Sequence, residues 1–568
     1  MRTYRGQRLI WLFFALLCLG GCLLCIRVHL GLDFSDETHY LALAKRFSQG
    51  DRPFREEWFP AQIVGILLLP FYHTYIKTAG GIEGILLTAR IIFVLFHTAA
   101  ALLVFWSLSR KEQMEIVPAF LFSFMFLFYA RANIHSFSYY NIGLITFLLY
   151  LILKRTEHRL AQAGSGILFA VSVLCMPYLV LYFLVMEIRK IIRCVKEKNY
   201  WKKEAAFLAG IAVSAGIFLW FCLSSGDAGE IFRNLPEILK DPEHQGTMAE
   251  SVISFGVFMV KVFYKYLFWP MAFESAGIVY YIWKGRRGEQ LKRFLKAAAY
   301  VLFFLQAVYL RTFFEGGVLI AFFLLAVQVS ALEQIHEREL WYGYGLPGLF
   351  YGIIWMLGSN VGQRVFNMGC LISCIWAVSI IWRDCQTSQK AWTKMWKLSA
   401  AGWTLLVLIV ISFFDIYRDS SVEHLTVRIE SGAAKGIYTS AGRAEEYEQV
   451  LKGLYAYAGE GKILAAEGVN PWLYLEADAE CGAQAVWRLD FADERNAVYY
   501  ERYPEKVPDV IFLLDPSCKT YEGWRFSSHG SYTGGAEKPE LEGYLLELAE
   551  RENYSRVEEK YGVYYIKK

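Results

Sequence analysis

The sequence lacks an excess of charge of either sign. Its 568 residues include 58 lysines and arginines against 54 aspartates and glutamates, and charged residues make up only 20% of the chain. A nucleic-acid-binding protein gathers basic residues on one face, so this balance argues against nucleic acid as a partner. The basic residues instead form short clusters between apolar runs, which is the pattern of a polytopic membrane protein.

Catalytic motifs are missing from the polar C-terminal part of the chain. Residues 415–568 contain no glycine-rich phosphate loop, no zinc-ligand spacing and no nucleophile elbow. Of eleven cysteines only Cys481 and Cys518 fall in this region. A disulfide between them and two free thiols both stay open. The histidines of the chain also show no metal-ligand spacing.

Long apolar runs dominate the rest of the chain. Hydrophobic residues make up 55% of the sequence and aromatic residues 17%, which is typical of a polytopic α-helical membrane protein. The run from Leu9 to Leu30 follows three arginines and has no clear cleavage site, so we expect a retained signal anchor with a cytoplasmic N-terminus. Placing the basic clusters inside predicts about 13 transmembrane helices within residues 1–414.

Two apolar runs need separate treatment. The run from Ala61 to His73 contains Pro70 and is too short to cross roughly 30 Å of hydrocarbon, so we expect a juxtamembrane or re-entrant helix. Basic clusters flank residues 166–188 on both sides, which requires an even number of crossings. Two short helices meeting at an outward-facing turn around Pro177 satisfy that requirement, and a single helix kinked at Pro177 is the alternative.

The composition turns polar after the last apolar run, which ends at Phe414. Residues 415–568 alternate helical patterns, such as Glu445 to Tyr457, with strand-like runs, such as Val510 to Leu514. This alternation predicts a small α/β domain. The expected topology places the domain outside the cytoplasm, where we assign it a structural or acceptor-recognising role.

Carboxylates cluster directly after the first apolar run, in an outer loop that spans residues 31–84. Asp33, Asp36 and Glu37 lie where the first helix leaves the membrane. Charges are costly to desolvate there, so acids at the mouth of a helical bundle are candidates for binding or chemistry. The alternative is that they are solvated loop residues, with Asp33 or Ser35 capping a short helix.

The expected topology brings four polar segments to the outer face, namely residues 33–58, 131–141, 224–251 and 359–367. A site for a membrane-delivered substrate would form where they converge. Asp36 and Glu37 are the catalytic candidates, as a general base and a second carboxylate for hydroxyl or metal contact. The substrate-binding candidates are Tyr40, Glu57, Arg131, Tyr139, Asn141 and Arg364.

Each binding candidate also has a structural interpretation. Arg131 and Arg364 suit either the fork that holds a phosphate or a snorkelling interfacial arginine. Tyr139 and Asn141 suit either ligand contact or a helix entrance with an aromatic belt. Adjacent carboxylates such as Glu56 and Glu57 repel each other when both are buried and ionised, so one of them should face water or a cation.

The segment Asp36-Glu37-Thr-His-Tyr40, followed by Asp51-Arg-Pro-Phe-Arg55, resembles the first outer loop of the GT-C glycosyltransferases. The likeness is to the bacterial lipid A aminoarabinose transferase and protein O-mannosyltransferase group. Those enzymes carry an Asp-Glu pair after the first helix, then a juxtamembrane helix. Many of them have thirteen crossings and an outer C-terminal domain.

This resemblance implies inverting transfer of a sugar from a polyprenyl-phosphate carrier to an envelope polysaccharide, lipid or protein. The reaction would take place at the outer face of a bacterial plasma membrane. By the resemblance Asp36 is the base, Glu37 helps to place acceptor or donor, and Arg364 is a candidate for the lipid phosphate.

The chain departs from the family in two places. Residues 131–141 contain no carboxylate, and Pro60-Ala61-Gln62 replaces paired prolines of the juxtamembrane helix. These departures leave substrate identity and metal use open. No cofactor is certain, and a divalent metal ion is an alternative to arginine in stabilising the departing phosphate. A transporter or flippase for an envelope lipid-linked substrate is the alternative function, but the chain has no internal repeat that would favour it.

Overall fold

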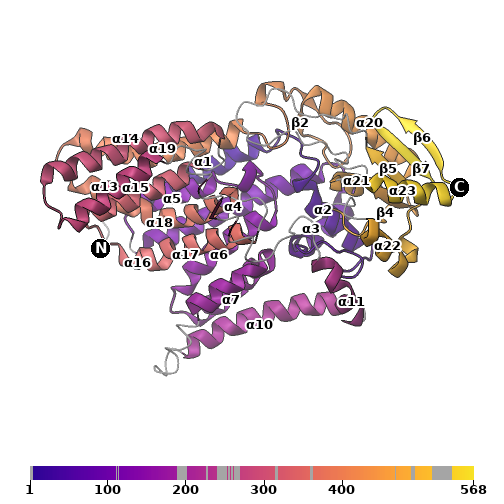
Figure 1. Ribbon diagram of the computed structural model, residues 1–568, viewed down its shortest axis with the longest axis horizontal. Helices are drawn as coiled ribbons and strands as arrows, with labels where there is room; N and C mark the ends of the chain where they lie inside the picture. Colours follow the sequence, from indigo (N-terminus) through magenta and orange to yellow (C-terminus); the bar gives the residue numbers. More distant parts are fainter. Residues whose placement is uncertain are drawn as a thin grey trace.

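The computed structural model is predominantly helical (Figure 1). It describes residues 4–110, 112, 114–187, 201–224, 228–239, 253, 256, 257, 260, 269–313, 317–358, 363–466, 469–487, 493–514 and 540–568. Figure 1 shows the apolar helices gathered at the end of the molecule that carries the N-terminus, with the strands β4 to β7 at the other end.

Five of the described helices are long and apolar enough to cross a membrane. They are α1 (Tyr4–Arg27), α4 (Ile85–Arg110), α10 (Trp201–Leu223), α18 (Gln363–Thr387) and α19 (Ala391–Phe414). Large apolar side chains lie exposed on several helices, among them Trp11, Trp220 and Phe273. Such surfaces are unusual on a protein surrounded by water. The architecture is therefore compatible with a helical membrane protein.

Helices that are shorter or less apolar fill the rest of the bundle. They are α3 (Ile63–Ala79), α5 (Ile116–Leu127), α6 (Tyr139–Lys154), α7 (Arg159–Cys175), α13 (Trp269–Trp283), α14 (Glu289–Phe313), α15 (Val318–Glu333) and α17 (Leu346–Leu357). Among them α3 is longer than the sequence suggested, because its helix continues through Pro70 to Ala79. Helix α7 ends at Cys175. Met176 is extended (φ −146°), and Pro177 begins a short 3₁₀ turn. Residues 188–200, which hold the end of the second expected helix and most of the basic stretch after it, lie outside the described residues.

The polar segment 224–251 is not only a loop. It contains helix α11 (Ala228–Leu239), whose apolar residues recur at helical spacing as Ile231, Leu235 and Ile238. Pro236 lies inside this helix. The excess of acidic residues, rather than the apolar spacing, had suggested a loop.

The C-terminal region contains a mixed five-stranded sheet in the order β4-β3-β5-β7-β6. Its strands are β3 (Ile463–Ala466), β4 (Glu480–Cys481), β5 (Val510–Leu514), β6 (Ser555–Glu559) and β7 (Gly562–Ile566). The strand β3 is parallel to β4 and β5, and β7 is antiparallel to β5 and β6. Helices accompany the sheet as α20 (Ala441–Tyr457), α21 (Pro471–Glu476), α22 (Asp493–Arg502) and α23 (Glu540–Arg551).

The C-terminal region shares one hydrophobic core with residues 31–84, the segment that is expected to be the first outer loop. That loop contains helix α2 (Asp36–Ser48), which packs against both α3 and α21. Buried residues of α2 and α3, such as Leu43 and Val64, belong to the same cluster as Leu464 and Trp472. Residues far apart in sequence thus form one unit at the end of the bundle (Figure 1).

Candidate functional site

Buried arginines fix the segment between α1 and α2. Arg90 on α4 donates to the carbonyl oxygens of Val28 and Gly31 at 2.7 and 2.8 Å. Arg443 on α20 donates to the carbonyl oxygen of Leu32 at 2.7 Å. These carbonyls follow the end of α1, so the guanidinium groups satisfy backbone acceptors of the segment that connects α1 to α2. The chain leaves α1 in a fixed direction.

Asp33 caps the N-terminus of α2, as the capping alternative predicted. Its carboxylate accepts from the backbone N–H groups of Ser35 and Glu37 at 3.1 and 3.0 Å. Burial raises the pKa of Asp33, and the charge of Arg418 does not offset it. Asp33 thus holds the helix start and leaves the first helical position to Asp36.

Asp36 lies between two arginines and a tyrosine from distant parts of the chain. Nη1 of Arg418 is 3.1 Å from Oδ2, and Nη1 of Arg131 is 4.0 Å from Oδ1. The Tyr417 hydroxyl donates to Oδ2. The side chain of Asp36 is 16% exposed and that of Arg418 is 20% exposed. Asp36 is therefore an ionised and partly exposed carboxylate.

The surrounding charges determine the protonation of Asp36. Burial raises the pKa of this carboxyl. The charges of Arg418 and Arg131 and the hydrogen bond from Tyr417 lower the pKa by a larger amount, so it lies below its ordinary value. The pKa of the neighbouring Asp33 moves in the opposite direction. Two carboxyl groups whose environments separate their pKa values are a common feature of acid–base sites.

Both arginines lie next to strained backbone. Arg418 itself has φ of +50°, and Arg131 precedes Ala132 and Asn133, which both have φ of +56°. Side chains other than glycine rarely adopt such angles, and they concentrate at functional sites. The Asn133 amide donates to the carbonyl oxygen of Ile411 at 2.9 Å, which fastens this turn to the end of α19. The turn that carries Arg131 is therefore bonded to the end of the helix that precedes Arg418.

Glu37 points away from this arrangement. It forms a two-pronged ion pair with Arg90, with Nε to Oε1 and Nη2 to Oε2 both at 2.5 Å. Only 2% of its side chain is exposed. A small polar cavity of about 20 Å³, enough for one water molecule, borders Glu37, Arg90 and His135. This placement favours a structural role for Glu37.

The aromatic candidates form a packed group beside Arg131. The guanidinium of Arg131 lies 4.2 Å from the centre of the Tyr140 ring. Tyr139 stacks on Trp355 with ring centres 5.9 Å apart, and it meets Tyr40 edge to face at 6.1 Å. This packing confines Arg131 and leaves it less freedom than Arg418.

Asn141 holds the segment before α6 in place. Its amide nitrogen donates to the carbonyl oxygens of Ile134 and Ser136 at 2.8 and 2.9 Å. Its amide oxygen accepts from the backbone N–H of Arg131 at 3.2 Å. The Ser138 hydroxyl caps α6 by accepting from the backbone N–H of Asn141 at 3.1 Å. Asn141 therefore positions Arg131 through its backbone.

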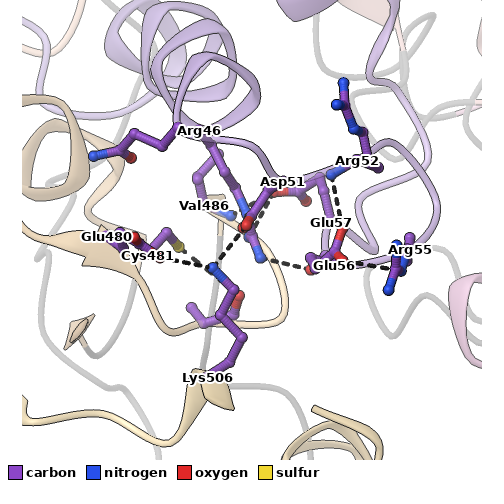
Figure 2. A network of polar contacts seen from close by, with 12 residues as sticks. Arg46, Asp51, Arg52, Arg55, Glu56, Glu57, Glu480, Cys481, Val486 and Lys506 are labelled. Carbon is purple, nitrogen blue, oxygen red and sulfur yellow. Dashed lines mark hydrogen bonds and ion pairs between the residues drawn. The ribbon is translucent and has the colours of Figure 1, made fainter. Parts of the chain in front are cut away.

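Glu57 belongs to a buried network at the other end of α2 (Figure 2). It accepts from Nη1 of Arg46 at 2.9 Å and from the backbone N–H of Val486 at 3.1 Å. Arg46 also donates to Asp51 at 2.6 Å, and Lys506 is 2.7 Å from Asp51. These contacts join the first outer loop to the C-terminal region. Glu57 is fully buried, which favours a structural role.

The remaining polar segments differ in whether the structure places them near the first outer loop. Glu230 on α11 is 2.6 Å from Arg55, so segment 224–251 meets the first outer loop, as segment 131–141 does. Arg364 lies in the first turn of α18, and its side chain lies outside the described residues, as do residues 359–362. Among the described residues no cluster of histidine, cysteine or acidic side chains is placed to hold a metal ion. Cys481 is a free thiol, and Cys518 lies outside the described residues.

Sequence reasoning missed Tyr417 and Arg418. They follow α19 by only a few residues and lie at the end of the bundle where the acidic segment follows α1. A tyrosine–arginine pair directly after the last apolar run was the available signal. Comparisons with known proteins add no assignment, since no protein-family model and no curated protein matches the chain.

Proposed function

We propose that this chain is a GT-C-type membrane glycosyltransferase. It moves a sugar from a polyprenyl-phosphate carrier to an envelope acceptor, and Asp36 is the general base. The proposal includes about 13 crossings of a bacterial plasma membrane, with the N-terminus inside and the α/β region 415–568 outside. The resemblance of the first outer loop supports the reaction class, and the apolar helices support the membrane setting.

The observation that carries the proposal is the environment of Asp36. Of the three acids that follow α1, Asp33 caps α2 and Glu37 is enclosed by Arg90. Asp36 alone combines a partly exposed carboxylate with two arginines and a tyrosine. A carboxylate that is ionised, positioned and partly exposed meets the requirements for a general base.

The proposed chemistry needs little beyond these groups. The acceptor oxygen attacks C1 of the sugar from the face opposite the carrier, and Asp36 takes the hydroxyl proton. The bond between C1 and the phosphate oxygen breaks, and polyprenyl phosphate leaves with both electrons. A base with a low pKa accepts the proton late, when the new bond is well advanced. Arginines beside the site stabilise the departing phosphate.

The C-terminal region forms part of the site's surroundings in this proposal. Arg418 and Tyr417 connect α19 to it, and Arg443 holds the carbonyl of Leu32, four residues before Asp36. We therefore assign it to the wall of the site, where an acceptor would approach, rather than to an independent appendage.

The test is a transfer assay with the purified full-length chain and polyprenyl-phosphate sugars, following which carrier is released. Asp36→Asn should lower the rate by two orders of magnitude or more and leave membrane insertion and thermal stability unchanged. Asp478→Asn makes the same chemical change at an exposed position and should transfer at the wild-type rate. Full activity of Asp36→Asn would refute the proposal. Lipid translocation by the wild type without any transfer would favour the transporter.

A further inference from the structure

The two carboxylate oxygens of Asp36 are held unequally. Oδ2 is engaged by both Arg418 and the Tyr417 hydroxyl, whereas Oδ1 faces Arg131 at 4.0 Å. A general base needs one oxygen within hydrogen-bond distance of the proton that it removes. Release of Arg418 would free Oδ2 for that role.

Arg418 is the partner with the most freedom. Arg131 is 5% exposed, lies on the Tyr140 ring, and has its backbone N–H bonded to Asn141. The side chain of Arg418 is 20% exposed and projects from a single residue with positive φ. Its Nη1 lies 3.1 Å from Asp36 and also donates to the Ser35 hydroxyl, and its guanidinium lies 4.9 Å from the centre of the Tyr417 ring.

A phosphate is the group best suited to draw Arg418 away. Guanidinium groups bind phosphate through two parallel hydrogen bonds, whereas the ion pair of Arg418 with Asp36 is made by Nη1 at 3.1 Å. The donor of the proposed reaction carries a phosphate next to the bond that breaks. Arg131 stays beside Asp36 during such an exchange, so the carboxylate keeps one cationic neighbour.

We propose that Arg418 is a phosphate-binding residue that is paired with Asp36 in this structure, and that a lipid-linked phosphate takes Arg418 from Asp36 when it binds. The exchange releases Asp36 to serve as the base only when the donor is in place. This inference rests on the proposed function for its meaning, since Asp36 is the base only there. It identifies Arg418, rather than Arg364 alone, as a residue that contacts the donor.

Loss of Arg418 as a neighbour also changes the basicity of Asp36. Arg418 is the larger of the two cationic influences that lower the pKa of this carboxyl. When the guanidinium moves to a phosphate, whose charge is negative, the pKa of Asp36 rises. Donor binding thereby makes Asp36 both accessible and a stronger base.

The experiment measures binding of polyprenyl phosphate, without sugar, to the purified full-length chain in lipid nanodiscs. Asp36→Asn removes the competitor for Arg418, so the expected result is binding about tenfold tighter than in the wild type. Arg418→Gln should bind about tenfold more weakly. In the double variant the gain from Asp36→Asn should disappear, because the two residues act on one contact.

Arg428→Gln is the matched control. Arg428 lies on β1 (Val427–Arg428), and its side chain is 52% exposed. The variant should bind like the wild type. Misfolding does not increase affinity, so the gain in Asp36→Asn is the decisive sign. Unchanged or weaker binding by Asp36→Asn, or an equal gain on the Arg418→Gln background, would overturn the proposal.

A parallel titration with inorganic phosphate identifies the source of the anion. Polyprenyl phosphate should bind at least ten times more tightly than inorganic phosphate, and equal affinities would overturn the assignment to a lipid. The proposed function fails separately. If the wild type transfers no sugar but the order of affinities holds, only the function is refuted. If the wild type transfers sugar but Arg418→Gln binds and transfers normally, only this inference is refuted.

Discussion

The two ends of α2 carry the same chemical groups in opposite settings. At its N-terminal end Asp36 meets Arg418 and Arg131. At its C-terminal end Arg46 meets Asp51 and Glu57. Both ends pair arginine with carboxylate, and both draw partners from beyond residue 400. Figure 2 shows the C-terminal end, where Lys506 meets Asp51.

The two ends differ in how completely the charges are enclosed. The side chains of Arg46 and Glu57 are 1% and 0% exposed, whereas those of Arg418 and Asp36 are 20% and 16% exposed. Arg46 also donates to the carbonyl oxygen of Glu56 at 2.6 Å and to the Tyr499 hydroxyl at 2.9 Å. A fully satisfied buried network fixes a structure. A partly exposed pair on strained backbone can exchange partners, which is the property that a site needs.

Removing Arg46 should give the largest effect on folding. Arg46→Ala leaves Glu57 as a buried carboxylate without its cation and leaves Asp51 with Lys506 alone, so we expect a loss of about 3–5 kcal/mol in unfolding free energy. Chemical denaturation of the purified chain, followed by tryptophan fluorescence, measures it. Asp36→Asn should lose far less, because water reaches both Asp36 and Arg418.

Arg52→Ala is the matched control for Arg46→Ala. It removes the same charge from the same loop, but Arg52 is only half-buried and no ion pair involves its side chain among the described residues. Its stability should equal that of the wild type. If Arg46→Ala were as stable as Arg52→Ala, the distinction between the two ends of α2 would be lost.

The pH dependence of stability should come from a buried carboxyl group that lies next to α2. Glu476, at the end of α21, lies beside Lys45. Burial raises the pKa of Glu476 from 4.5 to about 7, and the hydrogen bonds from Tyr447 and the backbone N–H of Ala433 offset it only in part. The folded protein therefore holds a proton that the unfolded chain releases.

This contribution is fully present below pH 4.5 and is lost as the pH rises through 7, on the order of 3 kcal/mol in total. Glu476→Gln should flatten the fall in unfolding temperature between pH 5 and pH 8. The exposed Glu460→Gln should leave that fall unchanged. A wild-type curve that rises over this range would contradict the expected direction.

The sequence predicted features that depend on neighbouring residues. The last apolar run predicted the end of α19 at Phe414, and the strand-like run from Val510 to Leu514 predicted β5. Capping by Asp33 was foreseen because a cap needs only the residues that follow it. The position of the three acids directly after α1 was also predictable, because it depends only on where the first apolar run ends.

Pairings across the chain were not predictable in this way. Asp36 and Arg418 are 382 positions apart, and nothing in either local pattern selects the other. Arg90 lies within an apolar run and was passed over, although it decides that Glu37 is enclosed while Asp36 is not. Which acid of an adjacent pair is reachable depends on tertiary contacts, so a sequence pattern names the pair and leaves the choice open.

The smallest expected effect tests the edge of the Arg46 network. Lys506 is 8% exposed and pairs with Asp51 at 2.7 Å and with Glu480 at 3.2 Å. Because Asp51 keeps Arg46, Lys506→Met should lower the unfolding free energy by only about 1–2 kcal/mol. The control is Lys560→Met, which breaks a fully solvated pair with Glu445 and should change nothing measurable. If Lys506→Met destabilised the chain as much as Arg46→Ala does, Asp51 would depend on both cations equally. The network would then act as one unit without a central arginine.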